Sequence, residues 1–209
     1  MRKTLAALIL AGGLSSRMGR EKASLEIEKR PLIQWACEAA GRFSDNVYIS
    51  VHDKQAISRL KPILPAGFTF VTDIVEGPRS VLLAFISSFP IIQEERVAVM
   101  PVDSPFMAKD VMTDILTRSE GFDLTIPMWP DGKLEAIHAV YDRTATLPIL
   151  QSLWAERKLE LREIAKRSKK TLFISTESLS EYDSALLSLL DADTPDEFAA
   201  LQAARTRTY

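Results

Sequence analysis

Two glycines and two cations lie close together near the start of the chain, in a pattern suited to binding phosphate. Residues 8–22 read LILAGGLSSRMGREK, which places Arg17 and Lys22 shortly after Gly12 and Gly13. Adjacent glycines let main-chain N–H groups approach an anionic oxygen, and two cations can bind several negative charges at once. The stretch therefore predicts a binding site for a polyphosphate.

The spacing excludes two common phosphate motifs. Five residues separate Gly13 from Gly19, and Lys22 comes three positions after Gly19, so the order of a Walker A loop is not met. The stretch contains no G-x-G-x-x-G either. The alternative is a plain glycine turn with solvated cations, which is usual for a lone glycine pair but unexpected for this whole string.

The string from Leu10 to Lys22 resembles the L-A-G-G-x-S-x-R-M-G-x-x-K signature of nucleotidyltransferases, most closely that of the molybdenum cofactor guanylyltransferase (MobA-like) family. The resemblance implies a Rossmann-like three-layer α/β/α sandwich with a mostly parallel sheet, of the nucleotide-diphospho-sugar transferase type. It also implies that nucleotide is bound by Leu10, Ala11, Gly12, Gly13, Arg17 and Lys22, of which Arg17 and Lys22 are catalytic.

Two acids, Asp73 and Asp103, each follow a predicted strand, at residues 68–71 and 96–100. Open α/β sheets bind ligands at the carboxyl ends of their strands. By resemblance Asp73 binds the nucleotide, and Asp103, in a C-D-x-P-F-like element, is catalytic and holds Mg²⁺, an ion that prefers oxygen ligands. The residue types alone leave alternatives open: Asp73 as a turn-forming acid, and Asp103 as the N-cap of a helix near Pro105.

Glu135 and His138 are candidates for contacting the second substrate. They lie in residues 135–141, which alternate like a strand and resemble the family's E-P-L-x-A-x-Y segment, with Ala136 in place of Pro. A buried, hydrogen-bonded structural role is the alternative for His138.

Asp191 and Asp193 stand where the family has the two amides of N-x-N-T-P. Carboxylates accept hydrogen bonds and bind cations but cannot donate to a phosphate. Asp191 is therefore a candidate for contacting the acceptor, and Asp193 a candidate metal ligand. The alternative for Asp193 is the N-cap of a helix that begins at Pro195.

The elements that must position these residues alternate in type, which is typical of a parallel sheet with helical crossovers. We expect a single domain over residues 1–209. Its strands are predicted at 5–10, 47–51, 68–71, 96–100, 122–127, 135–141 and 171–175, and its helices after Pro31, before Leu60, after Pro78, and at 110–118, 148–154 and 159–166.

Composition narrows the class of protein. The net charge of −2 predicts no general attraction to nucleic acid or to a membrane surface. Cys37 is the only cysteine, so no internal disulfide can form, and its apolar helical setting predicts a buried thiol. The apolar N-terminus imitates a short signal peptide, but we interpret it as the first core strand of a cytoplasmic protein.

The resemblance implies transfer of GMP from GTP, with Mg²⁺, to a phosphorylated acceptor, molybdopterin in this family, with release of pyrophosphate, and possible protein partners in cofactor delivery. The first motif is shared with cytidylyltransferases and with cobinamide-phosphate and sugar-phosphate nucleotidyltransferases. Arg79, Val81 and Ala136 depart from the family pattern. Val81, Ala136 and the two acids Asp191 and Asp193 keep open a different class, a degenerate non-catalytic nucleotide-binding protein.

Overall fold

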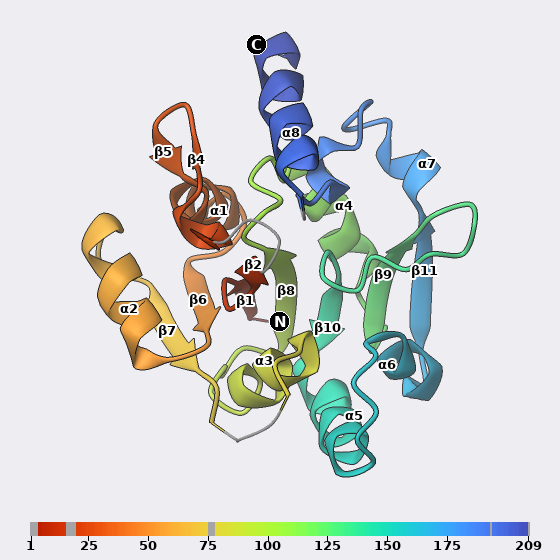
Figure 1. Ribbon diagram of the computed structural model, residues 1–209. Coiled ribbons are helices and arrows are strands. Elements are labelled where there is room, and N and C mark those ends of the chain that lie inside the picture. Colours follow the sequence, from red (N-terminus) through yellow and green to blue (C-terminus); the bar gives the residue numbers. More distant parts are fainter. Residues whose placement is uncertain (1–3, 16–19, 75–77, 193, 209) are drawn as a thin grey trace.

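The computed structural model describes residues 4–15, 20–74, 78–192 and 194–208. Its centre is a seven-stranded sheet in the order β11-β9-β10-β8-β1-β6-β7 (Figure 1). Only β10 runs antiparallel to its neighbours within this sheet. The mostly parallel sheet predicted from sequence is thus confirmed. The strands are β1 (Leu5–Leu10), β6 (Asn46–Val51), β7 (Thr69–Thr72), β8 (Arg96–Pro101), β9 (Leu124–Met128), β10 (Val140–Asp142) and β11 (Thr171–Ser175).

The first strand, β1, lies inside the sheet and is buried on both faces. It pairs in parallel with β6 on one side and with β8 on the other. Ala7 and Ile9 pack into one apolar cluster, whereas Ala6 and Leu8 pack into a second cluster across the sheet. A strand buried on both faces needs a continuous apolar run, which LAALIL supplies.

Helices cover both faces of the sheet, which gives the three layers (Figure 1). The cluster on one face includes buried residues of α1 (Leu32–Gly41), α2 (Lys54–Leu60) and α4 (Lys109–Arg118). The cluster on the other face includes residues of α3 (Val81–Ser88), α5 (Arg143–Ala155) and α6 (Arg162–Arg167). The remaining elements are short apart from the last: β2 (Leu14–Ser15), β3 (Arg20–Glu21), η1 (Lys22–Ser24), β4 (Glu26–Ile27), β5 (Arg30–Pro31), η2 (Lys61–Ile63), α7 (Thr176–Leu179), η3 (Leu187–Leu189) and α8 (Pro195–Thr208).

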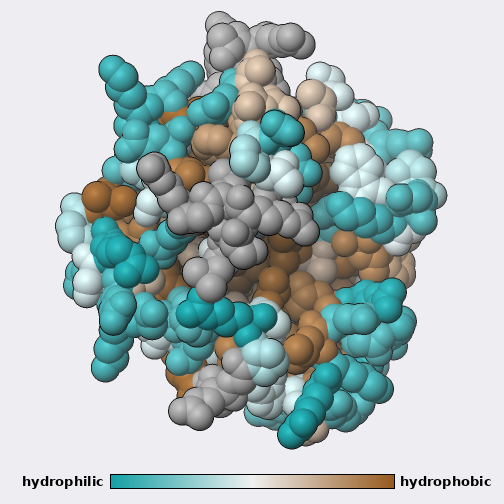
Figure 2. Space-filling model, in the orientation of Figure 1, coloured by the Kyte–Doolittle hydropathy of each residue, from teal (hydrophilic) through white to brown (hydrophobic). Residues whose placement is uncertain are grey.

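The surface has an apolar hollow. Figure 2 shows hydrophobic surface recessed near the middle of the face turned to the viewer, with hydrophilic side chains around it. Among the described helices, none combines the length and the apolar character that a membrane span requires.

Two predicted elements differ from those in the structure. The strand predicted over residues 135–141 is wrong for 135–139, because β10 begins only at Val140. Before it the chain turns, with the His138 N–H donating to the Glu135 carbonyl at 3.0 Å. The helix expected near Pro105 begins instead at Lys109 and has Ala108 as its N-cap, so Asp103 does not cap it.

The last helix begins with a capping box. The Thr194 Oγ1 accepts from the Glu197 N–H at 3.2 Å, and a Glu197 carboxylate oxygen accepts from the Thr194 N–H at 2.9 Å. The N-cap of the Pro195 helix is therefore Thr194 and not Asp193, the residue proposed for that role. Asp193 itself lies outside the described residues.

The backbone is strained at Arg157, just after the end of α5. This exposed residue has φ 57°, and the Lys158 N–H behind it donates to the Leu153 carbonyl, as in a Schellman motif. An L-residue pays a steric cost in this conformation that glycine avoids. We expect Arg157→Gly to raise the free energy of unfolding by about 0.5–1 kcal/mol, net of the extra entropy of an unfolded glycine. Urea unfolding measures this, and a fall in stability would contradict it.

Candidate functional site

The carboxyl ends of four neighbouring parallel strands meet at one edge of the sheet. Hydrogen bonds extend β1 beyond its last residue, because Ala11 N donates to Ser50 O at 2.8 Å and Val102 N donates to Leu10 O at 3.1 Å. The chain segments that leave β1, β6, β7 and β8 at this edge carry Gly12, His52, Asp73 and Asp103. This is the edge at which open α/β sheets bind ligands.

The two glycines of the loop after β1 differ in surroundings. A Cβ built on Gly12 would lie 3.3 Å from the main-chain nitrogen of His52, so the loop passes close to the end of β6. A Cβ on Gly13 would meet no atom within 4 Å, and this residue is exposed. Gly12 thus allows the close approach of two main chains, while Gly13 faces open space. The side chain of Ala11 is buried behind them, with 1% of its surface exposed.

A pocket of about 340 Å³ lies beside this loop. That volume falls in the range of small-ligand sites. Leu10, Gly12, Gly13 and Asp73, four residues predicted to bind nucleotide, line it together with His52 and Arg79. The structure therefore brings together residues that lie more than sixty positions apart in the sequence.

His52 and Asp73 form a hydrogen-bonded pair in the wall of this pocket. The His52 Nδ1 lies 2.7 Å from Asp73 Oδ2. Because a carboxylate only accepts, Nδ1 carries the proton, and the Nε2 of a neutral His52 is an acceptor. The sequence analysis missed His52. The available signal was the one that identified Asp103, a polar residue directly after a β-rich run, here residues 47–51.

Lys22 and Asp103, separated by 81 positions in sequence, form an ion pair beside the glycine loop. Their side chains are mostly buried, with 12% and 8% of their surfaces exposed. Arg59 of α2 holds the preceding residue, because its Nε donates to Glu21 Oε2 at 3.1 Å. The Asp103 carboxylate thus meets the cation of the first motif and does not point into the apolar interior.

The residues at this edge fit the chemistry of Mg²⁺, for which Asp103 is the predicted ligand. Within the described part of the chain no cluster of three or more His, Cys, Asp or Glu side chains could hold a metal. Mg²⁺ does not require one, because it is usually held by one or two carboxylates, substrate phosphates and waters. The Asp103 carboxylate already binds a cation, the Lys22 ammonium, next to the loop suited to phosphate.

Glu135 is held by its neighbours in the β9–β10 connection. Its Oε1 accepts from Trp129 Nε1 at 2.6 Å and lies 2.9 Å from Lys133 Nζ. Burial raises the pKa of this carboxyl, but interactions with His138, Lys133 and Trp129 outweigh burial and lower it to about 2. Glu135 is therefore a fixed anion in this connection, in which Met128 bridges to Leu134.

His138 is fully buried and links this connection to the residue after Asp103. Its Nε2 lies 2.9 Å from Ser104 Oγ, which donates to the Leu190 carbonyl at 2.7 Å. The structure thus supports a structural, hydrogen-bonded role for His138. Any influence on an acceptor would pass through neighbouring groups.

A second pocket, of about 660 Å³, brings two of the three acceptor candidates together. Glu135 and the exposed Asp191 both line it, along with Lys133, Ile137, Leu161 and Arg162. None of these residues lines the pocket beside the glycine loop. The two concave sites are therefore separate, since they share no lining residue.

Two predicted site residues, Arg17 and Asp193, lie outside the described residues.

A basic run, KRSKK at residues 166–170, lies at the amino end of β11, whereas the glycine loop lies at the carboxyl ends of the strands. Lys166 pairs with Glu163 and Arg167 with Glu156, as expected for a solvated helix end. Because the run lies at the end of the sheet away from the glycine loop, its position does not favour binding of the phosphorylated substrate there.

Known proteins are similar to this chain in fold and in sequence. A probable molybdenum cofactor guanylyltransferase of Methanosarcina mazei is 27% identical over 198 residues, 91% of this chain and 87% of that protein. The crystal structure of molybdopterin-guanine dinucleotide biosynthesis protein A from Archaeoglobus fulgidus matches with a TM-score of 0.82 at 20% identity, over 97% of this chain and 99% of that one. The 2-C-methyl-D-erythritol 4-phosphate cytidylyltransferase of Thermus thermophilus shares the fold at a TM-score of 0.66 and 14% identity, over 95% of this chain and 98% of that one.

The match to a family covers most of the chain. Residues 7–171 fit the MobA-like NTP transferase domain, a range that includes the glycine loop, both pockets apart from Asp191, and the Lys22–Asp103 pair. The chain is a nucleotidyltransferase that belongs to the MobA-like NTP transferase family.

Proposed function

We propose that this protein transfers GMP from GTP to a phosphorylated acceptor, molybdopterin, and releases pyrophosphate. The observation that carries the proposal is the Lys22–Asp103 ion pair beside the Gly12–Gly13 loop. It joins a phosphate-binding cation to a candidate metal ligand at the one edge where four parallel strands end. The names of two relatives from Methanosarcina, both probable molybdenum cofactor guanylyltransferases, support the choice of substrates.

The reaction needs positioning more than acid–base chemistry. A phosphate monoester is largely dianionic at neutral pH, so its oxygen can attack the α-phosphorus without a general base. One P–O bond forms as the bond to the pyrophosphate breaks. The loop N–H groups and Lys22 would hold the phosphates in line, and Lys22 would counter charge that develops on the leaving group.

Mg²⁺, held by Asp103 and by phosphate oxygens, would supply neutralisation of charge on the triphosphate. Lys22 would then exchange the Asp103 carboxylate for a phosphate oxygen. Asp103 would itself remain as an anion next to Mg²⁺ and Lys22 throughout turnover. The chain's own part is therefore to present one carboxylate and one ammonium beside the glycine loop.

The pocket wall supports guanine as the base. A neutral His52 presents Nε2 as an acceptor, and the Asp73 carboxylate also only accepts. Guanine carries N–H donors on adjacent ring and amino positions, so a pocket wall rich in hydrogen-bond acceptors complements that edge of the base.

The second pocket, with Lys133 and Arg162 in its wall, would receive the phosphorylated acceptor substrate. We place this reaction in the cytoplasm.

Pyrophosphate release from each of four NTPs tests the proposal. With Mg²⁺ and molybdopterin, we expect GTP to be used at least tenfold faster than CTP, ATP or UTP, a difference of about 1.4 kcal/mol in transition-state binding. A preference for CTP would instead indicate a cytidylyltransferase. Tight NTP binding with no turnover would indicate a non-catalytic nucleotide-binding protein.

A further inference from the structure

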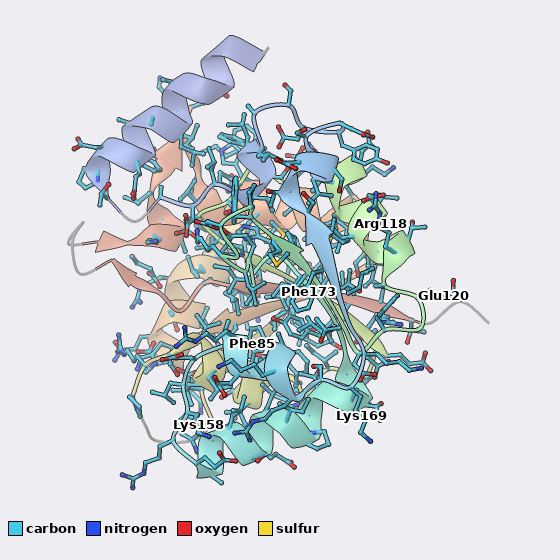
Figure 3. All side chains as sticks on the ribbon, turned by 90° about the vertical axis from the view of Figure 1, so that its right-hand side faces the viewer. Phe85, Arg118, Glu120, Lys158, Lys169 and Phe173 are labelled. Atoms are coloured by element: carbon cyan, nitrogen blue, oxygen red, sulfur yellow. The ribbon has the colours of Figure 1, made fainter. Side chains whose placement is uncertain are left out.

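The strand β11 forms one edge of the sheet and lacks the usual protection against pairing. Its five residues, TLFIS, include no charged residue, no proline and no glycine. Natural edge strands usually carry such residues, because an open edge can pair with another chain. Phe173, at the middle of β11, has 45% of its surface exposed. Figure 3 looks onto this edge, where Phe173 lies near the centre of the view.

The hydrogen bonds to β9 fix which main-chain groups of β11 face outward. The Lys170 carbonyl accepts from Leu124 N of β9, and main-chain groups alternate in direction along a strand. The groups of Thr171, Phe173 and Ser175 therefore point away from β9. The Ser175 carbonyl accepts from Ser178 Oγ at 2.8 Å. The outward edge thus presents Phe173 N–H and C=O, the Thr171 carbonyl and the Ser175 N–H.

The charges that flank this edge are opposite at its two ends. Lys169 precedes Phe173 by four positions, and Glu177 follows it by four. Both residues are exposed. A second copy of β11, paired antiparallel about Phe173, would bring the end of each strand that is preceded by Lys169 next to the end of the other that is followed by Glu177 of α7. A parallel pairing would set like charges side by side, which is unfavourable.

We propose that β11 pairs with β11 of a second copy of this chain, antiparallel and centred on Phe173. The two Phe173 residues exchange main-chain hydrogen bonds, and each Ser175 N–H donates to a Thr171 carbonyl of the other chain. The interface has twofold symmetry, so the same residues meet on both sides. It joins the two seven-stranded sheets into one continuous sheet and covers the exposed phenyl rings.

The proposed interface is separate from the nucleotide pocket. The glycine loop and the His52–Asp73 pair lie by β1, β6 and β7, whereas β11 is the last strand at the other end of the sheet order. Dimerisation therefore leaves the nucleotide pocket open. A monomeric but active enzyme would overturn this inference alone, and an inactive dimer would overturn only the proposed function.

Crosslinking through Phe173→Cys tests the register. Residues that form a hydrogen-bonded antiparallel pair have Cα atoms about 5.5 Å apart, within the reach of a disulfide. We expect Phe173→Cys to form a disulfide-linked dimer in mild oxidant. The native Cys37 should not interfere, because it is buried and burial raises the pKa of its thiol to about 12. Ile91→Cys, at an exposed apolar site outside β11, is the matched control.

Crosslinking of Phe173→Cys no faster than of Ile91→Cys would overturn the proposal. A monomeric mass for the unmodified chain, by light scattering at tens of micromolar, would overturn it too.

Charge reversal tests whether the two strands pair antiparallel or parallel. We expect Lys169→Glu and Glu177→Lys each to weaken the dimer roughly fivefold, since symmetry places each pair twice in the interface. The double variant should regain the lost affinity, and a double variant weaker than both would overturn the antiparallel register.

Discussion

Replacing Asp103 by Asn should lower kcat for nucleotidyl transfer by roughly 10³-fold, the size expected when a main electrostatic contributor at a reaction centre is lost. The amide keeps the shape of the side chain but removes the negative charge that pairs with Lys22 and that would hold Mg²⁺. Steady-state pyrophosphate release with saturating GTP and acceptor measures the effect. Raising the Mg²⁺ concentration should recover little of the activity.

Two observations separate a catalytic role of Asp103 from a structural one. Thermal unfolding of Asp103→Asn should change far less than its activity, because the side chain lies at the end of a strand and not within the apolar clusters. Asp45→Asn, at an exposed acid, is the matched control and should keep full activity. Near-normal, Mg²⁺-dependent turnover by Asp103→Asn would refute the assignment.

Lys22→Ala is expected to lower kcat/KM for GTP by roughly 10²-fold, through weaker binding of the phosphates in the transition state. Because Lys22 and Asp103 contact each other, their effects should not add. The double variant Lys22→Ala/Asp103→Asn should therefore lose less activity than the product of the two single losses. Kinetic measurements on all three variants give this coupling directly.

The loss of Lys22 also leaves the mostly buried Asp103 carboxylate without this partner. Stability should fall by about 1–3 kcal/mol as a result, which urea unfolding can separate from the kinetic effect. Lys54→Ala, at an exposed position in α2, is the control and should alter neither quantity much. If Lys22→Ala loses stability but keeps a near-normal kcat/KM for GTP, the residue is structural.

Much of the fold was predictable because the informative segments are locally consistent. Buried parallel strands read as continuous apolar runs, and β1 and β8 show this clearly. The segment 135–139 was not predictable from its pattern, because its alternation arises from a turn. There Glu135 is held by Trp129 and Lys133, contacts that the pattern of residue types does not reveal.

The sequence was enough to locate individual residues of the candidate site, but not the contacts between their side chains. The glycine loop, Asp73 and Asp103 could be located from strand ends and from resemblance. The pairing of His52 with Asp73 could not, because it depends on β6 and β7 lying side by side in register. The N-cap of α8 at Thr194 likewise depends on reciprocal hydrogen bonds that the types of neighbouring acids do not determine.

The position of β1 between β6 and β8 has a consequence for biosynthesis. The strand β1 pairs along its length with β8, which is synthesised much later, since Leu5 lies opposite Arg96. Until that later segment emerges, the nascent chain carries an apolar ribbon with one flank unpaired, a state prone to association with other chains. Lys22 and Asp103 therefore meet only after translation has continued 81 positions beyond Lys22.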